Sequence, residues 1–369
     1  MQHPVCIVGG GIIGLLSARE LHAAGQQVIV FDRQNIGKES SWAGGGILSP
    51  LYPWRYPNAV TELARISQAA YPGLVKDLQQ ETGIDAEWVR SGLLILGIED
   101  YEKALDWSSK YAISSKRVEK AEISDIQPGV SAANGPGFWM PDVAQVRNPR
   151  LLAAVARDLQ KKNIEMAENE AVTGFNVIDG KLSSIETDKR KIETDRCIIA
   201  AGAWSGELCQ QLGLDLPVRP VQGQMLLFKA KPGLLQRIIL KNDRYLIPRR
   251  DGRILIGSTV EEVGFNRGTT AEARQELHEV ALEMLPALAD AEVEMQWAGL
   301  RPGSPKGVPY IDRHPEVEGL FVCTGHFRNG FVLGPASARL ITDLVCNRAP
   351  QVDPAAFQLD PAAYQLVDT

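Results

Sequence analysis

A glycine-rich motif near the start of the chain, Gly9–Gly14 (GGGIIG), constrains the fold more than any other feature of the sequence. The apolar run 5–8 precedes it, a segment typical of a helix follows over 15–25, and a second apolar run over 28–31 ends at Asp32. This order of strand, glycine turn, helix, strand and acid is typical of the βαβ unit that binds dinucleotides. The sequence therefore predicts a dinucleotide site at this motif.

Each glycine of the motif has a physical reason to be there. Gly9 permits the tight turn, Gly11 lets the backbone approach a pyrophosphate, and Gly14 lets the helix pack on the strand. The free N–H groups at the helix N-terminus attract phosphate, and Asp32 is placed to accept hydrogen bonds from a ribose. A glycine-rich turn that arose by chance, the alternative, does not explain the flanking elements.

Composition excludes several classes of protein. The 369 residues suffice for two domains or one large composite domain. A net charge of −6 without a basic stripe argues against nucleic acid as a partner. The five cysteines lie far apart and the five histidines show no metal-ligand spacing, so we expect no disulfide framework and no metal site. No run is long and apolar enough to span a membrane, and a reducing, cytoplasmic location is expected.

The predicted elements alternate between helices and strands along the chain. Helices are expected over 58–83, 148–163 (capped by Asn148), 271–288 and 334–346. Strands are expected over 173–178, 181–187, 197–200, 218–228, 237–248, 253–259 and 320–323. The opening βαβ unit and the later segments 197–204 and 320–346 are expected to form one nucleotide-binding domain, with a sheet-rich domain inserted between them.

Two later glycine elements, 199–202 and 325–330, discriminate between dinucleotides. A nicotinamide enzyme usually combines one such motif with a separate catalytic domain that carries an acid or base. A second strand followed by a glycine turn, and a late helix N-terminus, are what an extended dinucleotide such as FAD requires. Backbone donors can then reach both the pyrophosphate and the flavin pyrimidine. The sequence therefore favours FAD.

Five segments resemble the FAD-dependent amino-acid oxidases of the D-amino acid oxidase type, and within that family the glycine oxidases. They are IVGGGIIG (7–14), YLIPRRDGRILIGST (245–259), WAGLRPG (297–303), PYIDRHP (309–315) and GHFRNG (325–330). The resemblance covers nearly the whole chain in the same order, and GHFRNG with WAGLRPG is far more specific than a GxGxxG motif. It implies an α/β fold in which a Rossmann-like FAD-binding domain of the glutathione-reductase type carries an inserted, mainly antiparallel, sheet-rich substrate-binding domain. We expect the FAD-binding domain over 1–84, 142–217 and 298–369, and the substrate-binding domain over 85–141 and 218–297.

The resemblance also implies the residues that contact a non-covalently bound FAD. These are, besides Gly9, Gly11 and Gly14, Ile12 and Ile13 at the pyrophosphate helix, Asp32 and Arg33 at the adenosine, Ser40 and Ser41 near the diphosphate, Gly45, Gly46 and Ile47 along the flavin, and Val172 at the adenine. The isoalloxazine and ribityl chain would contact His326, Phe327, Arg328, Asn329, Gly330, Phe331 and Val332. No cysteine lies in a context typical of covalent flavin attachment.

A carboxylate clamp is the other requirement of an amino-acid substrate, and the planar fork of arginine matches a carboxylate. By resemblance, Arg301 would bind the substrate carboxylate with help from the Tyr245 hydroxyl, with Arg328 close by. The small residues and the proline on either side of Arg301 predict a rigid, irregular setting. Each residue also fits a simpler interpretation: Arg301 as an arginine in a surface loop, Tyr245 as a core aromatic, and Arg328 as the partner of an acid. His326 is assigned no role in proton transfer.

The implied activity is oxidative deamination of glycine, sarcosine or small D-amino acids. A hydride would pass to flavin N5, and the products would be an imine that hydrolyses to glyoxylate or a keto acid, ammonia, and hydrogen peroxide from molecular oxygen. Thiamine biosynthesis is the pathway that the resemblance implies, and a homo-oligomer is compatible with it. The alternatives are an FAD-dependent D-amino acid or secondary-amine dehydrogenase that passes electrons to a quinone or carrier, a nicotinamide-dependent dehydrogenase, and a flavin-containing interaction or tRNA-modifying module.

Two features depart from the pattern of the family. Relatives often carry glutamate where this chain has Asp32, which is one methylene shorter. The segment Ser49–Arg55 is bulky and proline-rich. If this segment lines the active site or covers it as a lid, it sets the size of the substrate.

Overall fold

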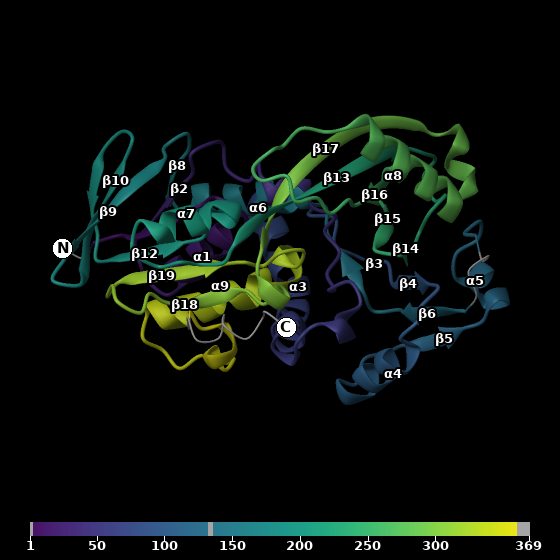
Figure 1. Cartoon of the computed structure of the whole chain (residues 1–369), viewed down its shortest axis with the longest axis horizontal. Helices are drawn as coiled ribbons and strands as arrows, with labels where there is room; N and C mark the ends of the chain where they lie inside the picture. The colour runs from purple at the N-terminus through teal and green to yellow at the C-terminus, as the bar shows by residue number, and fades with distance from the viewer. Residues whose placement is uncertain (1–2, 132–135, 360–369) are drawn as a thin grey trace.

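The computed structural model describes residues 3–131 and 136–359 of the chain. Figure 1 shows an elongated molecule with one sheet toward each end. The smaller of these two sheets contains the N-terminal strand, and the larger contains most of the strands from the middle of the sequence.

The first sheet has six strands in the order β18-β19-β12-β1-β2-β8. Their bounds are β1 (Val5–Val8), β2 (Val28–Phe31), β8 (Glu165–Ala167), β12 (Arg196–Ile199), β18 (Tyr310–Arg313) and β19 (Leu320–Thr324). All neighbours run parallel except β18, which pairs antiparallel at the edge. Segments far apart in the sequence therefore meet in this sheet, and β1 beside β2 is the predicted βαβ unit.

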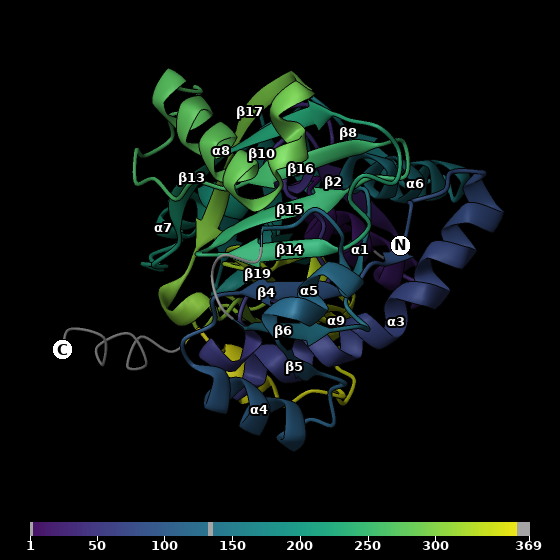
Figure 2. The ribbon, with the colours of Figure 1, turned by 90° about the vertical axis from the view of Figure 1, so that its right-hand side faces the viewer.

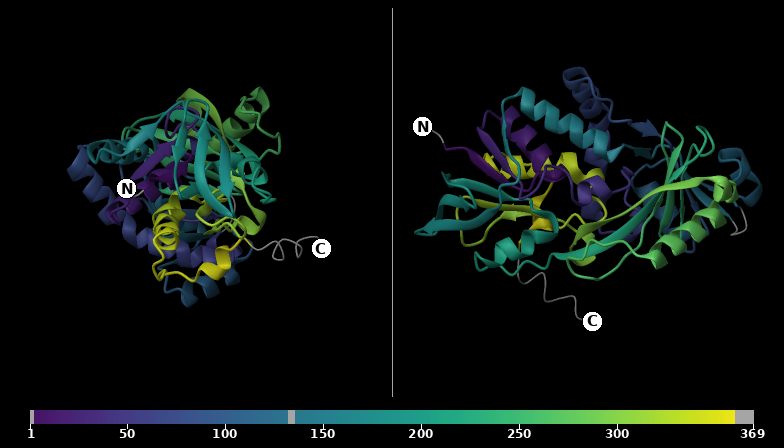
Figure 3. Two further views of the ribbon diagram at one scale, coloured as in Figure 1. Left: turned by 90° about the vertical axis from the view of Figure 1, so that its left-hand side faces the viewer. Right: turned by 90° about the horizontal axis from the view of Figure 1, so that it is seen from above.

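Both faces of the six-stranded sheet are covered, which explains why its strands are continuous apolar runs. One face packs against α1 (Ile12–Ala23), α3 (Asn58–Thr82), α6 (Asn148–Lys161) and α9 (Gly330–Val345). The other face packs against α7 (Ser205–Gln210) and a three-stranded sheet of β9 (Val172–Ile178), β10 (Lys181–Thr187) and β11 (Lys191–Glu193). The right-hand view of Figure 3 shows these helices on one side of the sheet and the β9–β10 hairpin on the other. The hairpin turns at Asp179 and Gly180, as the sequence predicts.

The second sheet has eight strands in the order β17-β13-β16-β15-β14-β4-β6-β5. Their bounds are β4 (Leu93–Leu96), β5 (Lys116–Val118), β6 (Gly137–Met140), β13 (Arg219–Lys229), β14 (Ile238–Lys241), β15 (Arg244–Pro248), β16 (Arg253–Gly257) and β17 (Glu292–Gly303). Every pair is antiparallel except β4 with β14. Figure 2 shows α8 (Ala271–Met284) lying across β13 and β16. Together the two sheets confirm the predicted fold class.

Short elements complete the described part of the chain. They are α2 (Ser40–Ala43), α4 (Tyr101–Lys110), α5 (Lys120–Ile126), β3 (Val89–Arg90), β7 (Ala144–Gln145), and the 3-10 turns η1 (Pro53–Arg55), η2 (Gly202–Trp204), η3 (Pro286–Asp290), η4 (Pro305–Gly307) and η5 (Pro354–Phe357). None of the helices among the described residues is both long and apolar enough to cross a membrane.

Two helix predictions are wrong at their ends. Asn148 is not the cap of α6, because the preceding residue, Arg147, takes the N-cap position. The side chain of Asn148 is fully buried, and its amide donates instead to the carbonyl of Ser41 at 3.0 Å. Helix α8 ends at Met284 rather than Leu288, because Pro286 begins the separate turn η3.

Three other predictions are wrong in the strands and in the last helix. The expected single strand over 237–248 is two strands, β14 and β15, joined at Asn242 and Asp243, both of which have positive φ. Helix α9 begins at Gly330, four residues earlier than expected. Arg301 lies in the regular strand β17 and not in an irregular turn, because β17 pairs with β13 along its whole length.

The division into an FAD-binding and a substrate-binding domain remains a proposal. Its boundary at residue 298 falls inside β17, whose pairing with β13 extends from Glu292 to Gly303. One strand of the larger sheet therefore continues across the proposed boundary.

Candidate active site

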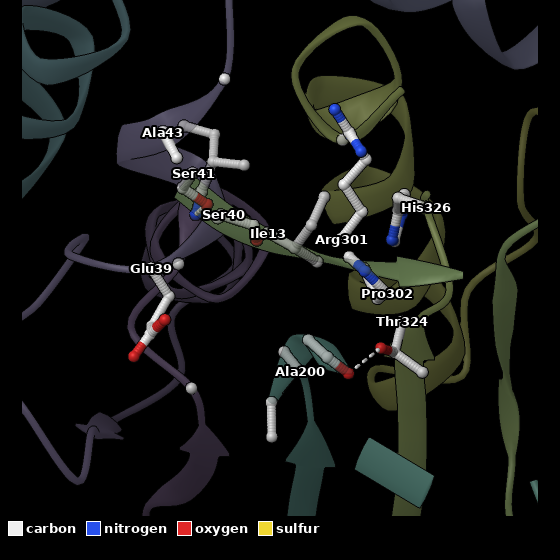
Figure 4. A pocket seen from close by; sticks show the side chains of 18 of the residues that line it. Ile13, Glu39, Ser40, Ser41, Ala43, Ala200, Arg301, Pro302, Thr324 and His326 are labelled. Carbon is white, nitrogen blue, oxygen red and sulfur yellow. Dashed lines mark hydrogen bonds between the residues drawn. The ribbon is translucent and has the colours of Figure 1, made fainter. Parts of the chain in front are cut away.

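A cavity of about 370 Å³ lies between the two sheets. Residues that follow three parallel strands line it: Gly9 after β1, Ala200 after β12 and His326 after β19. Carboxyl ends of parallel strands are the usual ligand-binding edge of an α/β sheet. Residues of the larger sheet, among them Tyr245 and Arg301, close the other side. Figure 4 shows Ser40, Ser41 and Ala43 of α2 on one side of this cavity, and Arg301 and His326 on the other.

The glycine motif forms the turn between β1 and α1. Gly9 has φ +115°, and a Cβ there would lie 2.3 Å from the carbonyl oxygen of Ala200. A Cβ on Gly14 would lie only 1.9 Å from the carbonyl oxygen of Gly9, so the first turn of α1 packs directly on the end of β1. A Cβ on Gly11 would meet only the hydroxyl of Ser41, at 3.1 Å. The same hydroxyl accepts a hydrogen bond of 2.9 Å from the amide of Ile12, the first residue of α1, and all three residues line the cavity.

The end of the cavity near Asp32 has the chemistry expected for an adenosine site. The Asp32 carboxylate accepts hydrogen bonds from the amides of Gly10 and Gln34, both at 2.9 Å, and burial raises its pKa. The Arg33 guanidinium stacks on the ring of Trp204 at 3.7 Å. Val172, at the start of β9, lines the same cavity. The structure thus brings Asp32, Arg33 and Val172 to one cavity, as predicted.

A buried arginine that the sequence interpretation missed holds the glycine loop 44–46. Arg249 donates to the carbonyl of Gly45 at 2.8 Å, to the carbonyl of Val146 at 3.0 Å, and to the side-chain oxygen of Gln145 at 2.8 Å. Burial lowers the pKa of Arg249 to about 10, so it remains a cation at neutral pH. Gly46 has φ +76°, and a Cβ there would lie 2.2 Å from the same Val146 carbonyl. No local pattern could have identified Arg249, because its partners come from distant segments.

Arg301 and Tyr245 lie together at the opposite end of the cavity. Nη1 of Arg301 donates to the carbonyls of Gln222 (3.1 Å) and Thr259 (3.2 Å), and Nη2 donates to the hydroxyl of Ser258 (2.5 Å). Burial lowers the pKa of Arg301 to about 10, an effect opposed by the nearby Tyr245, so the guanidinium stays charged at neutral pH. The structure therefore places the charged guanidinium of Arg301 and the phenol of Tyr245 in one wall of the cavity.

A second missed residue, Gly223, makes room for that cation. It lies in β13 opposite Gly299, two residues from the partner of Arg301. A Cβ on Gly223 would lie 1.9 Å from Nη2 of Arg301 and 2.3 Å from its Cζ, so the guanidinium occupies the space that any other side chain would fill. A glycine inside a predicted strand is the signal that could have found it.

The segment 326–331, which leads into the first turn of α9 at Gly330, lines the cavity. Burial lowers the pKa of His326 to about 3, and its Nε2 lies 3.0 Å from the hydroxyl of Ser337. The imidazole is therefore neutral at working pH. Arg328 lines the cavity, but its Nη1 also donates to Asp243 at 3.5 Å, so the simpler interpretation of an acid partner holds as well.

Most of the predicted site residues meet in this cavity. Those that line it are Gly9, Gly11, Ile12, Ile13, Asp32, Arg33, Ser40, Ser41, Gly45, Gly46, Ile47, Val172, Tyr245, Arg301, His326, Phe327, Arg328, Asn329, Gly330 and Phe331. Gly14 and Val332 are not among the lining residues, since Gly14 packs on Gly9 and Val332 is buried in the core beside α1. Among the described residues, no group of three or more histidine, cysteine or acidic side chains could hold a metal ion.

The segment Ser49–Arg55 lines the cavity at its start and is hydrogen-bonded to Asp100 at its end. Ser49 and Leu51 line the cavity, whereas the end of the segment is anchored to Asp100. Arg55 donates two hydrogen bonds of 2.8 Å to the Asp100 carboxylate, and Trp54 donates a third of the same length. These bonds, those from Arg55 first, lower the pKa of Asp100 to about 2.

Replacing Asp100 with asparagine is expected to destabilise the protein by about 1 to 2 kcal/mol at pH 7, since Arg55 and Trp54 lose their charged acceptor. Because the pKa of Asp100 is lower in the folded state, its stabilisation is present above the unfolded value of 3.8 and is lost as the pH falls toward about 2. Urea unfolding of both proteins at pH 7 and pH 3 should therefore show a difference that shrinks at the lower pH. Asp142→Asn, whose exposed carboxylate pairs with an exposed Arg90, is the matched control and should change stability little at either pH. An equal difference at both pH values would contradict the assignment.

The FAD dependent oxidoreductase family DAO matches residues 4–344 of this chain. The chain belongs to this family. It is 48% identical to a glycine oxidase of Pseudomonas aeruginosa, over 97% of this chain and 98% of that protein. A glycine oxidase of Pseudomonas putida is 46% identical over 97% of this chain and 98% of its own length. The crystal structure of glycine oxidase from Geobacillus kaustophilus superposes with a TM-score of 0.92 at 29% identity, covering 98% of this chain and 99% of that one.

FAD is accordingly the cofactor of this oxidoreductase, and the cavity passes a test of fit. At Gly11 the wall opens onto a helix N-terminus, the position that binds pyrophosphate. Gly45 lines the cavity, and a Cβ there would lie only 2.5 Å from Cδ1 of Ile247, so the loop fits at this point only as glycine backbone. The buried side-chain nitrogen of Asn329 has no described hydrogen-bond partner. Open backbone, an acid and an unpaired donor along one cavity are what a dinucleotide requires.

Proposed function

We propose that this protein catalyses the FAD-dependent oxidative deamination of glycine and of other small amines such as sarcosine and small D-amino acids. The observation that carries the proposal is the partly buried Arg301 guanidinium, held beside Tyr245 in the wall of the cavity that fits FAD. A cation in this setting matches the carboxylate of an amino acid. The similarity to proteins named glycine oxidase supports the same substrate.

The residues that we propose to hold FAD follow the cavity from end to end. Asp32, Arg33 and Val172 would bind the adenosine, and Gly9, Gly11, Ile12, Ile13, Ser40 and Ser41 the diphosphate. Gly45, Gly46, Ile47 and the segment 326–331 would bind the flavin and the ribityl chain. Arg249 would keep the loop at Gly45 in place through its carbonyl.

When bound, FAD supplies the flavin N5 that accepts a hydride from the substrate α-carbon. Arg301 and Tyr245 would fix the carboxylate, so that the α C–H bond has one orientation relative to the loop at Gly45. Because His326 is neutral, it does not supply a charged acid to the site. The scheme needs no protein base either, because the substrate amine loses its proton on or before binding. The imine would then hydrolyse to glyoxylate and ammonia. Molecular oxygen would act as the electron acceptor and be reduced to hydrogen peroxide.

An anaerobic glycine titration of the purified holoprotein tests this proposal. Bleaching of the visible flavin band by glycine, reversed in air with release of peroxide, would establish substrate and acceptor together. A band that glycine leaves unchanged would exclude glycine. Bleaching by glycine with little reoxidation in air would favour the dehydrogenase alternative, in which a quinone or carrier takes the electrons.

Replacing Gly223 with alanine is expected to raise the Michaelis constant for glycine by roughly 10- to 100-fold, because the added methyl group displaces the Arg301 guanidinium. Bound FAD should remain, since Gly223 lies at the substrate end of the cavity. Gly174→Ala in β9 is the matched control, as its nearest neighbour would be 3.8 Å away. Wild-type glycine kinetics in Gly223→Ala would show that the position of this guanidinium does not matter for substrate binding.

The family resemblance supports three further proposals. They are a role in thiamine biosynthesis, a cytoplasmic location and assembly into a homo-oligomer. Loss of the gene should then create a thiamine requirement, and light scattering of the purified protein measures the oligomeric state.

A further inference from the structure

Ser258 lies beside Arg301 in the wall of the cavity. It directly follows β16, its side chain is 4% exposed, and it is one of the lining residues. Its hydroxyl oxygen accepts a hydrogen bond of 2.5 Å from Nη2 of Arg301. It lies in the segment YLIPRRDGRILIGST (245–259), but nothing in that segment singled it out, because the contact depends on how β16 and β17 are placed on either side of β13.

The direction of that hydrogen bond leaves the hydroxyl hydrogen of Ser258 unused. A guanidinium can only donate, so Ser258 must accept from Arg301, whereas a serine hydroxyl has one hydrogen of its own to donate. Among the described residues, Ser258 donates this hydrogen in none of the hydrogen bonds. The hydrogen is thus available to a molecule in the cavity that Ser258 lines.

Arg301 has an unused hydrogen as well. Its hydrogen bonds to Gln222, Thr259 and Ser258 use three of the five N–H groups of a guanidinium, and the neighbouring Tyr245 hydroxyl takes at most a fourth. A carboxylate only accepts hydrogen bonds, and its two oxygens provide about four acceptor positions. It can therefore accept from Arg301 and from a neighbouring hydroxyl at the same time.

The backbone that carries Ser258 is itself held in place. The hydroxyl of the next residue, Thr259, accepts from the amide of Gln224 at 2.9 Å and donates to the carboxylate of Glu261 at 2.5 Å. The carbonyl of Thr259 accepts from Arg301. Serine and guanidinium are thus fixed relative to one another before any ligand enters, which is the requirement for a preorganised anion site.

We infer that Ser258 is a third substrate-binding group beside Arg301 and Tyr245, which donates its hydroxyl hydrogen to the carboxylate of the amino-acid substrate while it holds Arg301 in position. The inference rests on the proposed function and extends it. It means that the site selects α-amino carboxylates through a cation, Arg301, and two neutral hydroxyls, those of Tyr245 and Ser258. An amine without a carboxylate would satisfy none of these donors.

Acetate, a carboxylate without the reacting amine, is the probe that tests Ser258. Its dissociation constant is measured on holoprotein from the shift of the flavin absorption band, together with the glycine kinetics and the dissociation constant of FAD. Ser258→Ala should weaken acetate binding by roughly 10- to 100-fold and raise the Michaelis constant for glycine to a similar degree, because a hydrogen bond to a charged group is lost. FAD affinity should not change. Ser258→Thr, which keeps the hydroxyl, should restore most of the acetate affinity.

Ser184→Ala is the matched control. Like Ser258, Ser184 is buried and its hydroxyl accepts a hydrogen bond, in this case from the side-chain amide of Asn176 at 3.0 Å. Ser184 lies in β10, outside the cavity. The Ser184→Ala variant should therefore bind acetate as the wild type does.

Three results would overturn the inference about Ser258: wild-type acetate affinity in Ser258→Ala, equal losses of acetate and FAD affinity in that variant, or no recovery in Ser258→Thr. Failure of the proposed function looks different. In that case glycine fails to reduce the flavin of the unmodified protein, whatever acetate binding shows.

Discussion

Replacing Arg301 with alanine is expected to raise the Michaelis constant for glycine by roughly 100- to 1,000-fold while FAD stays bound. Arg301 is the charged donor that we assign to the substrate carboxylate, and its three protein hydrogen bonds hold it on the wall of the cavity. Without it the carboxylate would meet only Arg328, a cation that already donates to Asp243. Steady-state kinetics and the flavin absorbance of the same preparation measure both effects.

Two further variants separate charge from geometry at Arg301. Arg301→Lys keeps a cation but loses the planar fork, so it should recover only part of the affinity. Arg117→Ala, in which an exposed arginine of β5 is removed, is the control and should behave as the wild type. Normal glycine kinetics in Arg301→Ala would show that the carboxylate binds elsewhere. Loss of FAD from that variant would instead show that Arg301 supports the cofactor site.

Replacing Gly14 with alanine is expected to abolish FAD binding and to destabilise the protein by roughly 3 kcal/mol or more. A Cβ at this position would lie 1.9 Å from the carbonyl oxygen of Gly9, a backbone atom that cannot move aside without shifting the turn. The N-terminus of α1 would then leave the edge of the sheet where the pyrophosphate is expected. A colourless protein with a lower midpoint of urea unfolding is the expected result.

A glycine in α3 provides the control for Gly14. A Cβ on Gly73 would meet no atom within 4 Å, and alanine favours a helix, so Gly73→Ala should bind FAD normally and should not be destabilised. If Gly14→Ala remained yellow and as stable as the wild type, the close approach of α1 to β1 would not be what the motif requires. Gly11 makes a weaker test, because a Cβ there would meet only the Ser41 hydroxyl at 3.1 Å.

Local patterns were enough to predict the framework of the protein. The βαβ unit around the glycine motif, the hairpin turn at Asp179 and Gly180, and the strand β12 are encoded by neighbouring residues, and the structure contains all three. The ends of the helices were predicted less accurately, because tertiary contacts compete with the hydrogen bonds that cap a helix. Asn148 shows this, because its amide bonds to the carbonyl of Ser41 instead of capping α6.

The resemblance to a known family predicted a larger part of the candidate site than composition or periodicity could. It identified Arg301 and Tyr245, which the structure places in one wall of the cavity. It did not predict the setting of Arg301. The small residues around it suggested an irregular turn, but pairing with β13 makes this segment a strand.

The sequence by itself determined the FAD-binding βαβ unit, the α/β fold class and the membership of an FAD-dependent family, because these depend on residues close together in the chain or on long matching segments. Only the tertiary structure decided what surrounds the reacting groups. Gly223 lies under the Arg301 guanidinium, and Arg249 bonds to the loop at Gly45. Ser258 accepts from Arg301 across the sheet. Each of these contacts depends on strand register and burial between distant segments, and neither property is encoded in the spacing of neighbouring residues.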